Sequence, residues 1–374
     1  MAGKMSVIPL FKVHMPEAVS EALRRTLASG HIAQGAQVSE FEAGLRQLVG
    51  APDLCAVSDA SAGLTLALFL SGVCPGDEVI VSPLSCLATT MPIANLFARP
   101  VWCDVDPETG MPGPDHIRAR ASEKTKAVVA YFWSGNPTDV QSLKPSAPHA
   151  SLIADASEAF GAELHGRSLA LAGADFTIYS FSAVRHITTG EGGMLVARDR
   201  NALERVVRAR RYGIDQSTFR LPNGDLNPQS DILVPGFNFS MNNIAATLGI
   251  AQLAHVTQLI RSYRDNGAYF DCALDGIPGI RLLRRPEHSI SAHWTYSIRV
   301  ERRADLMRKL HEQRISVQRL HLRNDLYSCF AGVRQSDALP GVDVFDRENL
   351  SIPCGWWLTT EDREKIAACV RSGW

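Results

Sequence analysis

The chemically most capable side chains of this chain gather in one short turn. Ser180, Arg185 and His186 lie there between two apolar runs, residues 176–181 and 194–197. A hydroxyl or a guanidinium can bind an anion, and an imidazole can carry a proton near neutral pH. Connections that follow buried strands are common places for chemistry. The sequence therefore predicts a site in this turn.

Two further polar groups follow apolar runs. Residues 58–61, Ser-Asp-Ala-Ser, directly precede a helical pattern over residues 62–70. The N–H groups and the dipole of a helix N-terminus favour phosphate, although a serine at such a place is also an ordinary N-cap. Asp155 ends the run Leu-Ile-Ala-Asp, where a carboxylate serves either a ligand or a turn. Both alternatives stay open for each group.

Residues 180–193 carry a specific resemblance. They read Ser-Phe-Ser-Ala-Val-Arg-His-Ile-Thr-Thr-Gly-Glu-Gly-Gly. This string resembles the signature of the DegT/DnrJ/StrS sugar aminotransferases, in which Ser-Phe-His-x-x-Lys precedes Thr-Thr-Gly-Glu-Gly-Gly. That family uses pyridoxal phosphate on an aspartate-aminotransferase-like fold, called fold type I. Arg185 occupies the position of the lysine that binds the cofactor.

The resemblance implies a set of cofactor-binding residues. Ala60 and Ser61 align with the family's phosphate-binding Gly-Thr, and Ser180 supplies a second hydroxyl. Asp155 and Glu158 fall in Asp-Ala-Ser-Glu-Ala-Phe-Gly-Ala, which is similar to the family's Asp-Ala-Ala-His/Gln-Ala-x-Gly-Ala. The aspartate of that string pairs with the pyridine nitrogen of the cofactor.

Three other segments extend the resemblance along the chain. Cys86 stands where many members place an aromatic ring over the cofactor. Asn238 lies in Gly-Phe-Asn-Phe-Ser-Met, and the family's asparagine there reaches the phosphate of the neighbouring subunit, which implies a homodimer with shared sites. His321 and Asn324 lie in a string typical of the nucleotide-sugar branch, where they face the substrate or brace the C-terminal domain.

Arg185 changes the expected chemistry. The family's lysine forms an imine and moves protons, and both tasks need a neutral amine. A guanidinium stays protonated at pH 7, because removing its proton costs about 7 to 9 kcal/mol. His186 is the neighbouring candidate for a replacement proton carrier. No lysine falls at a strand end near the predicted site: the lysines are Lys4, Lys12, Lys124, Lys126, Lys144, Lys309 and Lys365.

Three functions follow from this departure. The first is an enzyme that binds pyridoxal or pyridoxamine 5′-phosphate without a covalent link and acts on a keto sugar, normally a nucleotide-linked one. The second is a cofactor-free partner or regulatory subunit in which Arg185 pairs with Asp155 or Glu158. The third is a cofactor-independent enzyme in which Arg185 holds an anionic substrate. If Arg185 were instead an engineered replacement of a lysine, the natural protein would carry out ordinary sugar aminotransferase chemistry.

Composition narrows the class of protein. The 374 residues carry a formal net charge of −1 and are 45% hydrophobic, with no basic stripe that would suggest nucleic acid. No apolar run is long enough to span a bilayer, and no signal sequence is visible, so we expect a cytoplasmic protein. Its 8 cysteines show no C-x-x-C spacing, so we expect no metal site.

Alternation of short apolar runs with helical stretches predicts an α/β fold. The fold class expected is a large domain with a mostly parallel, seven-stranded sheet, followed by a small α+β C-terminal domain. We place the large cofactor-binding domain at residues 1–250 and the small domain, including the connecting helix, at residues 251–374. The seven predicted strands are residues 54–57, 78–81, 101–104, 127–132, 152–155, 176–181 and 194–197.

Overall fold

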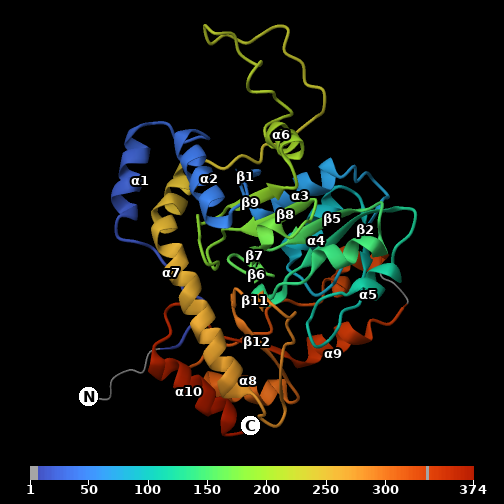
Figure 1. The fold of residues 1–374 in the computed structure, drawn as a ribbon, viewed down its shortest axis with the longest axis vertical. Coiled ribbons are helices and arrows are strands. Elements are labelled where there is room, and N and C mark those ends of the chain that lie inside the picture. The colour runs from blue at the N-terminus through green and yellow to red at the C-terminus, as the bar shows by residue number, and fades with distance from the viewer. Residues whose placement is uncertain (1–6, 334–336) are drawn as a thin grey trace.

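A seven-stranded sheet forms the centre of the protein in the computed structural model, which describes residues 7–333 and 337–374 (Figure 1). The strand order is β1-β9-β8-β5-β4-β2-β3, and only β9 runs antiparallel to its neighbours. The strands are β1 (Leu54–Val57), β2 (Glu78–Val81), β3 (Arg99–Trp102), β4 (Thr125–Tyr131), β5 (Ser151–Asp155), β8 (Phe176–Ser180) and β9 (Gly193–Ala197).

Each predicted strand is a strand of this sheet. The runs are mostly apolar because helices cover both faces of a parallel sheet and leave no face to water. The predicted α/β class with a mostly parallel seven-stranded sheet is therefore confirmed. The carboxyl ends of β1, β2, β5 and β8 meet at one edge, where ligands bind in sheets of this kind.

Ten α-helices surround the sheets within the described residues. Helices α1, α2 and α7 pack together beside the central sheet (Figure 1). The sequence pattern suggests two helices between residues 244 and 274, but α7 is continuous for 32 residues because no glycine or proline interrupts it at residues 260–262. The helices are α1 (Val19–Ala28), α2 (Ala36–Val49), α3 (Ala60–Leu70), α4 (Leu87–Asn95), α5 (Pro114–Arg118), α6 (Arg200–Ala209), α7 (Asn243–Leu274), α8 (Arg303–Glu312), α9 (Pro340–Glu348) and α10 (Thr360–Arg371).

A second hydrophobic cluster lies around a small antiparallel sheet, β10-β12-β13, with residues of α7, α8 and α10. Ile8 of the N-terminal segment belongs to this cluster, and the predicted boundary at residue 250 falls inside α7. The division into two domains stays a prediction. The minor strands are β10 (Ile280–Leu282), β12 (Tyr296–Val300), β13 (Asn349–Ile352), β6 (Glu163–Leu164), β7 (Arg167–Ser168) and β11 (Ser289–Ile290).

The connection between α6 and α7 projects away from the body of the protein (Figure 1). Its exposed apolar side chains include Leu233, which is 79% exposed, Leu226 and Val234. Among the described helices, none combines the length and the apolar character that crossing a bilayer requires.

Candidate active site

A polar cavity of about 330 Å³ opens at the carboxyl edge of the central sheet. Segments that follow β1, β2, β5 and β8 form its walls, so the topology brings together residues far apart in the chain. The lining residues are Asp59, Ala60, Ser61, Cys86, Ala88, Thr89, Asp155, Ser157, Ser180, Ser182, Arg185 and Glu191.

One wall is the N-terminus of α3. Asp59 is its N-cap, and its Oδ1 accepts the N–H of Ala62 at 2.8 Å. The N–H groups of the first helical turn have no partner inside the helix and face outward from its end. A side chain at Gly193 would place its Cβ 2.9 Å from the nitrogen of Ala60, so this glycine lets β9 approach the helix start. The wall is a ready site for an anion.

Asp155 contributes a buried carboxyl group to the lining of the cavity. It is 4% exposed, and it accepts hydrogen bonds from the Thr89 hydroxyl at 2.6 Å and the Ser157 N–H at 3.1 Å. No cation of the described residues forms an ion pair with it. Burial raises the pKa of Asp155 above its ordinary value. A cationic ligand would therefore be favoured beside this carboxyl group.

Arg185 also lines the cavity, and its charge is balanced from behind. Its Nη1 lies 3.4 Å from Oε1 of Glu158, and the two side chains are 8% and 0% exposed. The guanidinium lies over the ring of Trp294, with 4.1 Å between Cζ and the ring centroid. Nε and Nη1 are buried without an acceptor in hydrogen-bonding geometry among the described residues. Arg185 thus has donor capacity to spare.

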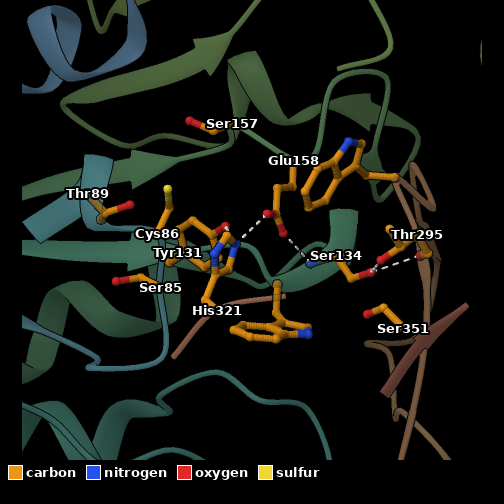
Figure 2. A network of polar contacts seen from close by, with 12 residues as sticks. Ser85, Cys86, Thr89, Tyr131, Ser134, Ser157, Glu158, Thr295, His321 and Ser351 are labelled. Atoms are coloured by element: carbon orange, nitrogen blue, oxygen red, sulfur yellow. Dashed lines mark hydrogen bonds and ion pairs between the residues drawn. The ribbon is translucent and has the colours of Figure 1, made fainter. Parts of the chain in front are cut away.

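Glu158 is the centre of a buried hydrogen-bond network (Figure 2). Its Oε2 accepts the N–H of Ser134 at 2.7 Å, and its Oε1 accepts Nε2–H of His321 at 2.9 Å. The hydroxyl of Tyr131 lies 3.0 Å from the same nitrogen of His321. Although burial opposes the charge, the hydrogen bond from His321 and the charge of Arg185 hold the pKa of Glu158 below its ordinary value. Glu158 is therefore an ionised carboxylate.

Trp294 is held on both sides. Its Nε1–H donates to the carbonyl oxygen of Val184 at 2.6 Å. Its ring stacks on Phe11 with centroids 4.8 Å apart and an interplanar angle of 21°. The N-terminal segment, Trp294 and Arg185 form one continuous stack that ends at the cavity.

His186 does not line the cavity. Its Nε2–H donates to the carbonyl oxygen of Ala292 at 3.0 Å, and its ring packs on Tyr263 with centroids 4.5 Å apart. Burial lowers the pKa of His186 to about 4. This geometry favours a neutral structural imidazole, and the predicted role as a proton carrier stays untested.

The remaining predicted residues occupy different places. Cys86 lines the cavity, and burial raises the pKa of its thiol, so the sulfur stays protonated. Asn324 is buried and donates to the carbonyl oxygen of Ser85 at 3.0 Å, which braces the segment that carries Cys86. Asn238 is exposed and does not line the cavity.

The described lysines lie elsewhere. None of them lines the cavity, and Lys4 is outside the described residues. Lys144, for example, donates to the carbonyl oxygen of Ala150 at 2.6 Å, and Lys309 donates to Ser372 at 2.7 Å. No described lysine stands ready to replace Arg185.

Several site residues were not predicted individually. Thr89 lies in residues 82–89, the segment around Cys86 that resembles the family, and this resemblance was the available signal. Tyr131 is the last residue of β4, and its place at the carboxyl end of a strand was the available signal. Trp294 reaches Arg185 across more than a hundred residues of sequence, and no local pattern indicates such a contact.

Comparison with known proteins agrees with this architecture. The sugar aminotransferase CalS13 from Micromonospora echinospora is 34% identical, with a TM-score of 0.92 over 98% of this chain and 100% of that one. AtS13 from Actinomadura melliaura is 34% identical, with a TM-score of 0.93 over 99% and 100%. The aminotransferase TlmJ from Streptoalloteichus hindustanus is 28% identical, with a TM-score of 0.88 over 98% of each chain. The sequence also matches one family over residues 14–371, and the chain belongs to that family, the DegT/DnrJ/EryC1/StrS aminotransferases.

Proposed function

We propose that the protein binds pyridoxal or pyridoxamine 5′-phosphate without a covalent link and acts on a keto sugar, normally nucleotide-linked, in the synthesis of amino or deoxy sugars. The family implies this cofactor. The observation that carries the proposal is Asp155, a buried carboxyl group on the cavity wall that has no cationic partner among the described residues. A protonated pyridine nitrogen would supply that partner.

The cavity residues fit such a cofactor. The first-turn N–H groups of α3, with the hydroxyls of Ser61 and Ser180, would hold its phosphate. Asp155, oriented by Thr89 and Ser157, would hold its ring nitrogen. When bound, the cofactor would supply an electron sink next to the substrate carbon.

The protein's own groups divide the remaining tasks. Arg185 cannot bond covalently to an aldehyde at neutral pH, but it can donate hydrogen bonds to an oxygen atom in the cavity. Glu158 and Trp294 fix the guanidinium in place. His321 does not line the cavity and bonds to Glu158, so it helps to hold the carboxylate that pairs with Arg185.

We also propose a homodimer with shared sites. The projecting connection between α6 and α7 exposes Leu226, Leu233 and Val234, and a neighbouring subunit would cover these side chains. Asn238, at the base of the connection, would then reach the partner's cavity. Sedimentation velocity should give a dimer, and Leu233→Asp should shift the protein toward monomer. A monomeric wild type would refute this assembly.

One observation favours a second candidate, the cofactor-free partner subunit. This candidate pairs Arg185 with either Asp155 or Glu158, and the buried pair of Arg185 and Glu158 is one of these two alternatives. The cofactor-free candidate does not explain why Asp155 is buried without a cation. Burying an unpaired carboxylate costs free energy, and a subunit with no cofactor would gain nothing in return.

A spectral titration separates the two candidates. Wild-type protein is titrated with pyridoxal 5′-phosphate, and Asp155→Asn serves as the matched control. Saturable binding that the control weakens supports the cofactor enzyme. Absence of binding at millimolar cofactor supports the cofactor-free subunit.

A further inference from the structure

We propose that Ser134 is a positioning residue that holds the guanidinium of Arg185 on Glu158 and away from Asp155. Arg185 lies between two neighbours, the carboxylate of Glu158 and the ring of Trp294. Ser134 binds the segments that carry both of them. The effect of Ser134 on Arg185 follows from these contacts alone, whereas its effect on cofactor binding rests on the proposed function.

The backbone of Ser134 holds the carboxylate. Its N–H donates to Oε2 of Glu158 at 2.7 Å (Figure 2), while Oε1 of the same group lies 3.4 Å from Nη1 of Arg185. A hydrogen bond to one oxygen fixes the rotation of the carboxylate and therefore the direction in which the other oxygen points. Ser134 and Glu158 are both buried, so bulk solvent cannot replace this donor.

The hydroxyl of Ser134 holds the other neighbour of the guanidinium. It donates to the carbonyl oxygen of Thr295 at 2.8 Å and lies 2.5 Å from the Thr295 hydroxyl (Figure 2). Thr295 directly follows Trp294, whose ring centroid is 4.1 Å from Cζ of Arg185. Ser134 therefore joins the carboxylate of Glu158 to the segment that carries the ring.

The backbone conformation of Ser134 indicates that its contacts impose it. Its φ is +57° and its ψ +19°, in the left-handed region that residues with a Cβ rarely adopt. Such a conformation persists only where the surroundings over-determine it. Gly135 follows with φ +87°, and a Cβ there would lie 2.8 Å from the carbonyl oxygen of Glu158. The turn is thus pressed against Glu158, and the bonds to Thr295 help to keep the N–H of Ser134 directed at the carboxylate.

Asp155 is the alternative partner for an arginine that leaves Glu158. The two side chains line one cavity, and Asp155 forms no ion pair with any described residue. Burial raises the pKa of Asp155, and Arg185 is among the groups that oppose this rise, so the two charges already interact. A released Arg185 would gain a buried, unpaired carboxylate as its partner. Under the proposed function, that new pair would occupy the carboxylate that the ring nitrogen of the cofactor needs.

Chemical modification of the ligand-free protein measures how firmly Arg185 is held. Phenylglyoxal modifies accessible guanidinium groups, and peptide mass mapping gives a rate for each arginine. Arg210, a buried arginine of another ion pair, is the internal reference for general loosening. Ser134→Ala should raise the ratio of the Arg185 rate to the Arg210 rate about tenfold, because the freed backbone can turn its N–H away from the charged carboxylate. Ser351→Ala removes another buried hydroxyl of the region in Figure 2 and should leave this ratio unchanged.

Two further variants separate the hydroxyl from the backbone. In Ser134→Gly the backbone adopts a positive φ without strain, so the N–H can stay on Glu158 and the ratio should rise less than in Ser134→Ala. Ser134→Cys fills nearly the same space with a weaker donor, and it should raise the ratio even if Ser134→Ala does not fold. An unchanged ratio in the folded Ser134→Ala or Ser134→Cys protein would overturn the inference, whether or not the protein binds a cofactor.

A calorimetric titration tests the consequence for binding. Pyridoxine 5′-phosphate is the probe, because it has the ring and the phosphate but forms no imine with lysines. Ser134→Ala should bind it several-fold more weakly than Ser351→Ala at pH 7, since the released Arg185 competes for Asp155. Unchanged affinity in a variant with a reactive Arg185 would overturn the role assigned to Asp155. A wild type that does not bind the probe would overturn the proposed function, and the modification rates would still decide whether Ser134 holds Arg185.

Discussion

Arg185 pairs with Glu158 at 3.4 Å, whereas Asp155, which lines the cavity with Arg185, forms no ion pair with any described residue. The two carboxyl groups lie three positions apart in one turn, yet they face different surroundings. Glu158 is ionised and surrounded by donors, whereas burial raises the pKa of Asp155. Removing one member of the buried pair leaves an uncompensated charge, which typically costs about 3 to 5 kcal/mol. The pair therefore anchors Arg185 and leaves Asp155 available for a ligand.

Arg185→Lys should permit a covalent link to pyridoxal phosphate. A lysine at this position can reach the neutral state that an imine requires, which the guanidinium cannot. Glu158 stabilises the ammonium form, so the double variant Arg185→Lys, Glu158→Gln should form the adduct at lower pH than the single variant. Borohydride reduction followed by peptide mass mapping locates the link. If neither variant carries cofactor at residue 185, the alignment at that position is wrong.

Asp155→Asn should weaken cofactor binding and raise the free energy of unfolding of the ligand-free protein at pH 7. Because the pKa of Asp155 is raised in the native state, its stabilising contribution is complete below its ordinary pKa and is lost as the pH rises through the raised value. Without ligand, the variant should therefore have a higher free energy of unfolding than the wild type at pH 7, and the difference should vanish below about pH 4. Urea unfolding at both pH values measures this, with Thr89→Ser as the control. A variant less stable at pH 7 would argue that an unseen partner already neutralises the carboxylate.

Arg185 and Trp294 should be energetically coupled. A desolvated cation–π contact contributes about 0.5 to 2 kcal/mol. A double-mutant cycle of Arg185→Met and Trp294→Leu, followed by urea unfolding, isolates this energy from the cost of truncating a buried ring. Trp294→Phe keeps a ring and should retain part of the coupling. Additive effects of the two substitutions would show that Trp294 does not help to hold Arg185.

His186→Gln should reduce the decrease in the free energy of unfolding that the protein shows as the pH falls from 6.5 to about 4. The pKa of His186 is lowered to about 4, so its contribution is complete above about pH 6.5 and is lost as the pH falls toward 4. That loss is about 3 kcal/mol, and buried His293, whose pKa is lowered to about 3, adds to the same slope. The glutamine can keep the donor to Ala292, so cofactor affinity should not change. A large loss of cofactor affinity would instead show that His186 contributes to the cofactor site.

The fold was predictable because its strands are short, mostly apolar runs separated by helical stretches. All seven runs became strands of one sheet, and the residues after them met at one edge. That topology explains why Ala60, Ser61, Asp155, Ser180 and Arg185 line one cavity. Helix α4 was missed because Pro92 lies inside it, and a proline normally indicates the end of a helix.

The rest of the site depends on contacts that no local pattern encodes. His186 was considered beside Arg185 because the two are neighbours in sequence, but adjacent side chains in this turn point to different sides. Glu158 was one of two predicted partners for Arg185, and only packing could choose between them. The stack of Phe11 and Trp294 joins residues far apart in the chain, so sequence spacing gives no sign of it.

The central claim is reversible, non-covalent cofactor binding, and one measurement tests it most directly. Wild-type protein and Asp155→Asn are each mixed with pyridoxal 5′-phosphate, followed by absorbance, and then divided between dialysis and borohydride reduction. We expect a saturable, free-cofactor-like band in the wild type that dialysis removes, with no reduced adduct beyond that of the control. A stoichiometric adduct on a wild-type lysine, or no saturable binding at millimolar cofactor, would contradict it.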